Sequence, residues 1–134
     1  MSSKSKTVGT RAETKVRRYF ETNGLRCERK ALAGSNDEGD LRLYTPDGLE
    51  ITIEVKAGEQ TASYGRKLLD KWKRQTLDEA ENSGCLAILI VVRHRRKFVD
   101  AEVWMPNTTG DKKLMSFWTM TYINDFVDVI KGSE

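Results

Sequence analysis

Residues 39–58 read GDLRLYTPDGLEITIEVKAG, and this pattern predicts a β-hairpin. Pro46-Asp47-Gly48 is a turn sequence that separates two runs of alternating apolar and polar residues. Because successive side chains of a strand point to opposite faces, Glu54 and Lys56 share one face and the aliphatic residues share the other. A carboxylate and an amine therefore lie side by side.

The register of this hairpin also follows from its alternation. With residues 45–49 as the connection, Leu41 lies opposite Ile53 and Asp40 lies opposite Glu54, whereas a slip of one residue would set apolar against polar side chains. Opposed carboxylates repel unless a positive charge lies between them, and a hard cation such as Mg²⁺ suits oxygen ligands of this kind. An exposed polar face with no metal is the alternative at this point.

The composition is typical of one globular domain. The chain has 134 residues, of which 38% are hydrophobic and 32% charged. We expect a single domain over residues 1–134, with residues 1–9 as a flexible basic arm that could touch DNA. No apolar run is long enough for a membrane span, and no leader of the secretory type is recognisable. A cytoplasmic protein, prokaryotic or viral and acting in the host cytoplasm, is expected.

Cysteine and histidine do not form a zinc pattern here. The spacing of Cys27, Cys85 and His94 matches no known zinc motif. Both cysteines fall in predicted strands, which favours reduced and buried thiols. His94 is best interpreted as part of a basic turn.

Basic residues gather in three segments of a chain whose net charge is only +3. The segments are residues 1–30, the set Arg66, Lys67, Lys71, Lys73 and Arg74, and the run 93–97. Such clusters suit a phosphate backbone, although solvated basic faces are also common on proteins that bind no nucleic acid.

The rest of the chain predicts an α/β protein with a mixed sheet. A capping box from Thr10 to Glu13 starts the first helix, so Glu13 can cap that helix, point across a cleft to the hairpin acids, or do both. The other expected elements are strands at 25–30, 85–92 and 98–105, loops at 31–38 and 106–113, an extended segment at 114–120, and helices at 65–82 and 123–130.

The motif residues resemble those of the PD-(D/E)XK nuclease superfamily. They are Glu13, Gly39-Asp40-Leu41, Glu54-Val55-Lys56 and Gln75, placed on an α-β-β-β-α-β order. Within the superfamily the chain is most similar to the archaeal-type Holliday junction resolvases, over residues 8 to 105. The resemblance implies a restriction-endonuclease-like core with a mixed central sheet flanked by helices.

The resemblance also implies a role for each motif residue. Asp40, Glu54 and the Val55 carbonyl would bind Mg²⁺ or Mn²⁺, with Glu13 as a further ligand, directly or through water. Lys56 would orient the attacking water or steady the phosphate. Gln75 would position the nucleophile or the hairpin, unless it is only a polar residue on the helix surface.

DNA, in particular the four-way junction, is the partner that the resemblance implies, and a homodimer would cut it symmetrically. Residues that could contact phosphates are Arg11, Arg29, Lys30, Ser35, Arg66 and Lys67. Two alternatives stay open: another nuclease of the superfamily acting on other DNA in repair, restriction or end processing, and a DNA-binding protein without catalysis.

Overall fold

The computed structural model describes residues 3–30, 40–106 and 118–132 of the chain. Its helices are α1 (Ser3–Thr22), α2 (Arg66–Ser83) and α3 (Ile123–Lys131), and short 3-10 turns are η1 (Glu59–Thr61) and η2 (Phe98–Asp100). Its strands are β1 (Arg26–Arg29), β2 (Leu41–Tyr44), β3 (Glu50–Lys56), β4 (Leu86–Val91), β5 (Glu102–Pro106) and β6 (Trp118–Tyr122).

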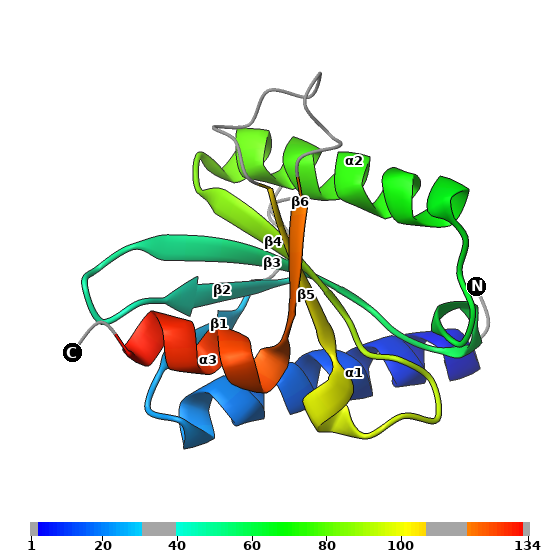
Figure 1. Ribbon diagram of the computed structural model, residues 1–134, viewed down its shortest axis with the longest axis horizontal. Coiled ribbons are helices and arrows are strands. Elements are labelled where there is room, and N and C mark those ends of the chain that lie inside the picture. Colours follow the sequence, from blue (N-terminus) through cyan, green and yellow to red (C-terminus); the bar gives the residue numbers. More distant parts are fainter. Residues whose placement is uncertain (1–2, 31–39, 107–117, 133–134) are drawn as a thin grey trace.

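The six strands form one sheet in which their order in space is their order in the chain (Figure 1). Strands β3 and β4 run parallel, and α2 is the crossover between them, whereas the other neighbouring strands are antiparallel. Strand β4 has a partner on each side, and five of its six residues are buried, as predicted for a central strand. The mixed sheet with flanking helices confirms the predicted fold class.

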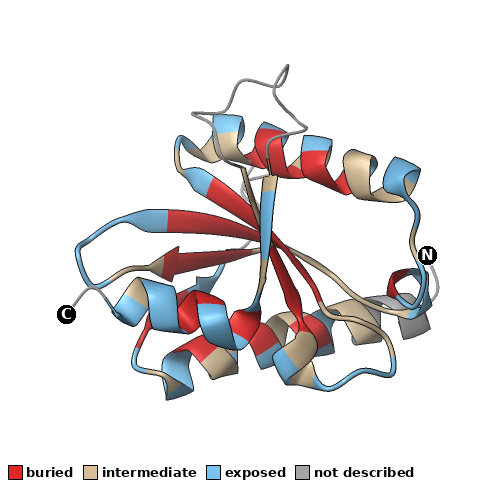
Figure 2. Cartoon of the chain, in the orientation of Figure 1, coloured by how far each residue is buried: buried red, intermediate tan, exposed pale blue. Residues whose placement is uncertain are grey.

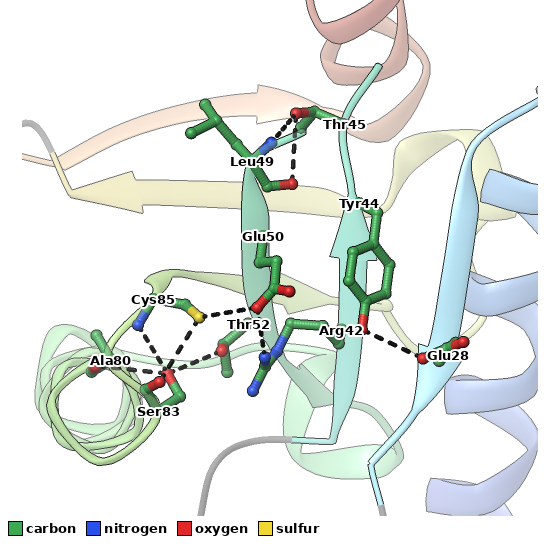
Figure 3. Close-up of polar contacts among 10 residues, drawn as sticks. All are labelled: Glu28, Arg42, Tyr44, Thr45, Leu49, Glu50, Thr52, Ala80, Ser83 and Cys85. Atoms are coloured by element: carbon green, nitrogen blue, oxygen red, sulfur yellow. Dashed lines mark hydrogen bonds and ion pairs between the residues drawn. The ribbon is translucent and has the colours of Figure 1, made fainter. Parts of the chain in front are cut away.

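Strands β2 and β3 form the predicted hairpin in the predicted register. Leu41 pairs with Ile53 and Leu43 with Ile51. The connection is closed by Thr45, whose N–H donates to the Leu49 carbonyl and whose Oγ1 accepts from the Leu49 N–H, both at 2.9 Å (Figure 3). The predicted five-residue connection is confirmed, and with it the faces of the β3 side chains.

The turn end of the hairpin is tied to the end of α2 (Figure 3). Thr52 Oγ1 lies 3.0 Å from Ser83 Oγ, and Glu50 Oε2 lies 3.0 Å from Arg42 Nη1 and 3.5 Å from Cys85 Sγ. Cys85 precedes β4 and is half-buried, so the expectation of a buried strand cysteine is wrong there. It is correct for Cys27, which is 3% exposed in β1.

Helices cover both faces of the sheet, α1 and α3 on one side and α2 on the other (Figures 1 and 2). Ile51, Ile53 and Val55 pack into the cluster that includes side chains of α1 and α3, so Glu54 and Lys56 point to the α2 side. Within the described ranges, no helix has the length and apolar character that crossing a bilayer requires.

Helix α1 begins earlier than predicted. It starts at Ser3, so residues 3–9 are helical rather than a flexible arm, and Thr10 lies inside the helix instead of capping it. The extra turns place Val8 next to Gly58. A Cβ atom added to Gly58 would lie only 3.6 Å from Val8 Cγ1. Local composition does not encode this contact.

The strand predicted at 98–105 is shorter than expected. Residues 98–100 form η2, and β5 starts at Glu102. The Phe98 ring lies 5.3 Å from that of Tyr19, and the Asp100 N–H donates to the Lys97 carbonyl, so an aromatic contact and a local turn replace extended backbone. The chain then adds β6, which we expected only as an extended segment ending at Met120.

Candidate active site

The two hairpin carboxyls meet where β2 begins. The Asp40 N–H donates to the Ile53 carbonyl at 2.9 Å, and Asp40 Oδ2 accepts from the Val55 N–H at 2.8 Å. The Glu54 carboxyl, 3% exposed as a residue, is hydrogen-bonded to that of Asp40. The hairpin therefore holds two carboxyls in contact, and the alternative of a solvated polar face is wrong for Glu54.

Burial and crowding change the protonation of Glu54. Burial raises its pKa, and the negative charge of Asp40 raises it further, to about 8, although Lys56 acts in the opposite direction. A cation close to such a carboxyl favours its ionised form and so lowers its pKa. Its environment therefore favours a bound positive charge.

Lys56 follows Glu54 on the same face of β3 and lies against α2. Its Nζ lies 3.1 Å from Glu54 Oε2 and donates to Gln75 Oε1 at 2.9 Å. Gln75 comes from the middle of α2 and is half-buried, so it is not a polar residue of the helix surface. The structure brings Glu54, Lys56 and Gln75 together, as the sequence predicts.

Glu13 lies in the middle of α1, which excludes its interpretation as an N-terminal cap. Burial raises its pKa, and the nearby charge of Asp40 adds to this effect, while Arg29 opposes it. Arg29 Nε is 3.6 Å from Glu13 Oε1. Glu13 thus extends the acidic group toward α1, and Arg29 is its ion-pair partner.

Sequence reasoning missed one member of the site. Glu79 is 1% exposed in α2, and its carboxyl is close enough to that of Glu54 to lower the pKa of Glu54. Glu79 lies four residues after Gln75, a spacing that sets two side chains on one helix face. This spacing from Gln75 was the sequence feature that could have indicated Glu79 as a member of the site.

The predicted DNA-contacting residues are spread over several elements. Arg66 and Lys67 are exposed in the first turn of α2, Arg29 is engaged with Glu13, and Lys30 is half-buried at the end of β1. Arg11 is exposed on α1 and lines a groove beside the site. Ser35 lies outside the described residues.

The donors at the site suit a hard divalent cation. The carboxylate oxygens of Asp40 and Glu54 and the backbone carbonyl of Val55 are ligands of the type that Mg²⁺ and Mn²⁺ prefer. Among the described residues, no set of three or more His, Cys, Asp and Glu side chains forms a ready-made metal cage. A site with two carboxylates would be completed by water and by the substrate phosphate.

The chain is similar in sequence to UPF0102 proteins of Burkholderia. It is 28% identical over 74 residues to that of Burkholderia cenocepacia, which is 55% of this chain and 52% of the relative. It is 30% identical over 71 residues to that of Burkholderia ambifaria, with 53% and 50% covered. The chain thus spans about half the length of these curated relatives. No protein-family model matches it.

The fold is that of a solved resolvase. Hjc, a Holliday junction resolvase from Archaeoglobus fulgidus, superposes with a TM-score of 0.57, covering 89% of this chain and 99% of the resolvase at 18% identity. The resemblance to the archaeal resolvases is therefore confirmed for the fold. At this identity the comparison addresses architecture, so the activity of the chain rests on its own residues.

Proposed function

We propose that this chain is a divalent-metal-dependent endonuclease that hydrolyses phosphodiester bonds in branched DNA as a homodimer. The observation that carries the proposal is the convergence of Asp40, Glu54 and Lys56 at the end of one hairpin, on the α2 side of the sheet. The resolvase fold supports the four-way junction as the substrate.

Each donor has a place in this chemistry. Asp40, Glu54 and the Val55 carbonyl would hold Mg²⁺ or Mn²⁺, which supplies a Lewis acid, a bound water of lowered pKa and positive charge for the phosphate. Glu13, next to Asp40, would bind the same ion directly or through water. A neutralising ion also explains how two touching carboxyls are tolerated.

Lys56 and the two α2 residues would orient the reactants. The Lys56 ammonium, held between Glu54 and Gln75, can donate a hydrogen bond to the attacking water or to a phosphate oxygen. Gln75 fixes the direction of that ammonium from α2. Glu79, which lies close enough to the Glu54 carboxyl to affect its pKa, would help to position that carboxyl.

A cleavage assay on an end-labelled four-way junction, with Mg²⁺, Mn²⁺ or EDTA, tests the proposal. We expect Glu54→Gln and Lys56→Ala to lower the cleavage rate by about 100-fold or more while junction binding in EDTA stays near normal. Glu59→Gln, an exposed acid in η1, is the matched control and should cut like the wild type. Undiminished cleavage by either site variant would contradict the proposed site.

A competition between junction and linear duplex tests the substrate. The resolvase proposal expects the junction to be cut first, whereas equal cutting of both would assign the chain to the other nucleases of the superfamily. Salt-dependent binding with no cleavage in either metal would leave a DNA-binding protein without catalysis. The three outcomes are mutually exclusive.

A further inference from the structure

A basic groove of about 610 Å³ lies beside the candidate active site. One wall is the part of α1 from residue 8 to residue 18, and the other is the turn after β4, residues 92–96, with Ala57 and Gly58 between them. Six cationic side chains line it: Arg11, Lys15, Arg18, Arg93, Arg95 and Arg96. Among its lining residues in the described part of the chain, none is Asp or Glu.

The groove and the site lie on opposite flanks of α1. Residues two apart on a helix are separated by about 200°, so Arg11 and Lys15 project away from the side that carries Glu13. The buried side chains of Ala12 and Val16 form the ridge between the two flanks. The cations of the groove are therefore not neutralised by the acids of the site.

The turn that forms the second wall is firmly built. The His94 N–H donates to Thr61 Oγ1 at 2.8 Å, and that hydroxyl also contacts the Val92 carbonyl at 3.1 Å. Arg93 Nη1 lies 2.9 Å from Glu102 Oε2, and its Nη2 donates to the Ala62 carbonyl at 2.9 Å. The charge of Arg93 is therefore paired with a carboxylate of the protein itself.

Arg95 and Arg96 differ from Arg93. Both are exposed, and within the described ranges neither has a carboxylate at ion-pair distance. Arg95 has φ 60, a left-handed backbone conformation that is strained for a non-glycine residue. The fold thus maintains two uncompensated guanidinium groups on a strained turn, opposite the cations of α1.

We propose that this groove binds the sugar-phosphate backbone of a DNA arm outside the cleavage site. The inference rests on the proposed function and deepens it. The groove begins at Ala57, and Gly58 is only two residues beyond Lys56, a reach of no more than roughly 7 Å of chain. A polyanion that places one phosphate at Lys56 therefore extends directly into the groove.

The occupant is better described as a phosphodiester than as an acidic peptide. Guanidinium groups bind phosphate oxygens in bidentate fashion, and regularly spaced phosphates suit cations on two facing walls. Val8, Ala12, Ala57 and Val92 supply the aliphatic side chains of the lining, and none of its described lining residues is Phe, Tyr or Trp. The groove therefore contributes affinity without base recognition.

The test measures binding of an end-labelled four-way junction to the full chain in EDTA from 50 to 300 mM NaCl. The groove variant is Arg95→Gly with Arg96→Ala, because glycine adopts φ 60 without strain. The matched control also loses two exposed charges, through Arg26→Ala with Lys131→Ala, and neither of these residues lines the groove. Circular dichroism checks that both variants fold.

We expect the slope of log K against log[salt] to become shallower by about two in the groove variant and to stay unchanged in the control. Cleavage at saturating protein in Mg²⁺ should be unchanged, because the groove acts on binding. A wild-type slope in the groove variant, or an equal change in the control, would overturn the proposal. Failure of the wild type to cleave would refute the proposed function while the salt slope still tests the groove.

An acidic polypeptide is the rival occupant, and the same variants address it. If the groove variant lost binding to poly-glutamate while its DNA salt slope remained that of the wild type, the groove would be a protein-binding surface and the proposal would be wrong. If its DNA slope falls and poly-glutamate competes only weakly with the junction, the phosphate backbone is supported.

Discussion

Glu54 is the side chain on which the candidate site depends. It is buried at the end of β3, touches the carboxyls of Asp40 and Glu79, and has the Lys56 ammonium 3.1 Å away. When all three carboxyls are ionised, their negative charge exceeds the single positive charge of the Lys56 ammonium. Protonation or a bound cation must relieve it, and the two differ in their dependence on pH.

The raised pKa of Glu54 predicts that the metal-free protein loses stability as pH rises. Below pH 4.5 Glu54 is protonated in both states; between 4.5 and about 8 the folded state keeps a proton that the unfolded state has released. The free energy of unfolding therefore falls across this window, by a few kcal/mol at most, and levels off above it. Urea unfolding in EDTA at pH 5, 7 and 9 measures the change.

Glu54→Gln removes the titrating group and should flatten this pH dependence, making the variant more stable than the wild type at pH 9. Glu59→Gln, at an exposed position, should keep the wild-type dependence. A variant Glu54→Gln that is less stable than the wild type at pH 9 would show that Glu54 is ionised and compensated in the folded protein.

Cys27 should be chemically silent in the folded protein. Burial raises the pKa of its thiol to about 12, and the residue is 3% exposed, so almost no accessible thiolate exists at neutral pH. In a Cys85→Ser variant, labelling by a disulfide reagent should then proceed only as fast as the protein opens. The reciprocal Cys27→Ser variant, which retains the half-buried Cys85, should label faster.

At the scale of elements, the unit β3–α2–β4 assembles the site. Strand β3 supplies Glu54 and Lys56, and the crossover helix returns Gln75 and Glu79 to the same face. A hydrogen bond of 3.0 Å from Thr52 Oγ1 to Ser83 Oγ holds the far end of the helix. The geometry of the candidate site therefore depends on how α2 packs on the sheet.

Gln75→Ala should lower the cleavage rate by roughly 10- to 100-fold, because it releases the Lys56 ammonium from its fixed direction without removing it. Arg74→Ala, the exposed neighbour on α2, is the control for helix propensity and should retain activity. Single-turnover rates at saturating protein separate this effect from binding. An equal loss in both variants would instead point to damage to the helix.

The central strand should dominate stability. Ile88 is fully buried in β4, so Ile88→Ala should cost about 2–5 kcal/mol of unfolding free energy, measured by urea titration. Leu86→Ala in the same strand removes a side chain that is 50% exposed and should cost clearly less. Similar losses at both positions would mean that strand propensity outweighs burial.

Patterns that recur along the chain were predictable, and single tertiary contacts were not. Alternation fixed the register from Leu41 to Ile53, and the spacing of apolar residues located α2 and α3. The extra turns of α1 bring Val8 close to Gly58, and no local sequence pattern indicates that proximity. Glu79 was missed because a buried glutamate in a charged helix looks like a surface residue until Glu54 is seen beside it.

At the scale of the whole molecule, charge is separated into an acidic site and a basic groove on two sides of α1. The proposed substrate is long enough to occupy both. A junction, however, offers two symmetrical strands to be cut, whereas one chain has one candidate site. The proposed homodimer resolves this mismatch.

Mixing subunits tests the dimer. Hybrids of wild type and Glu54→Gln, allowed to exchange before DNA is added, should nick one strand of the junction and leave the opposite strand intact. Pure wild type should cut both strands. Complete cutting by hybrids that are shown to form, at the wild-type rate, would contradict the assignment of one strand to each subunit.

The chain order of the strands has a consequence for biosynthesis. Because every strand pairs with its predecessor, the sheet can widen in a single direction as the polypeptide emerges from the ribosome. Among the elements that the structure describes, only the β3–β4 pairing must wait for an intervening α-helix to be synthesised. The acid-bearing hairpin is therefore synthesised before α2, the helix that completes its polar lining, and β4 to β6 are added to the sheet after that helix.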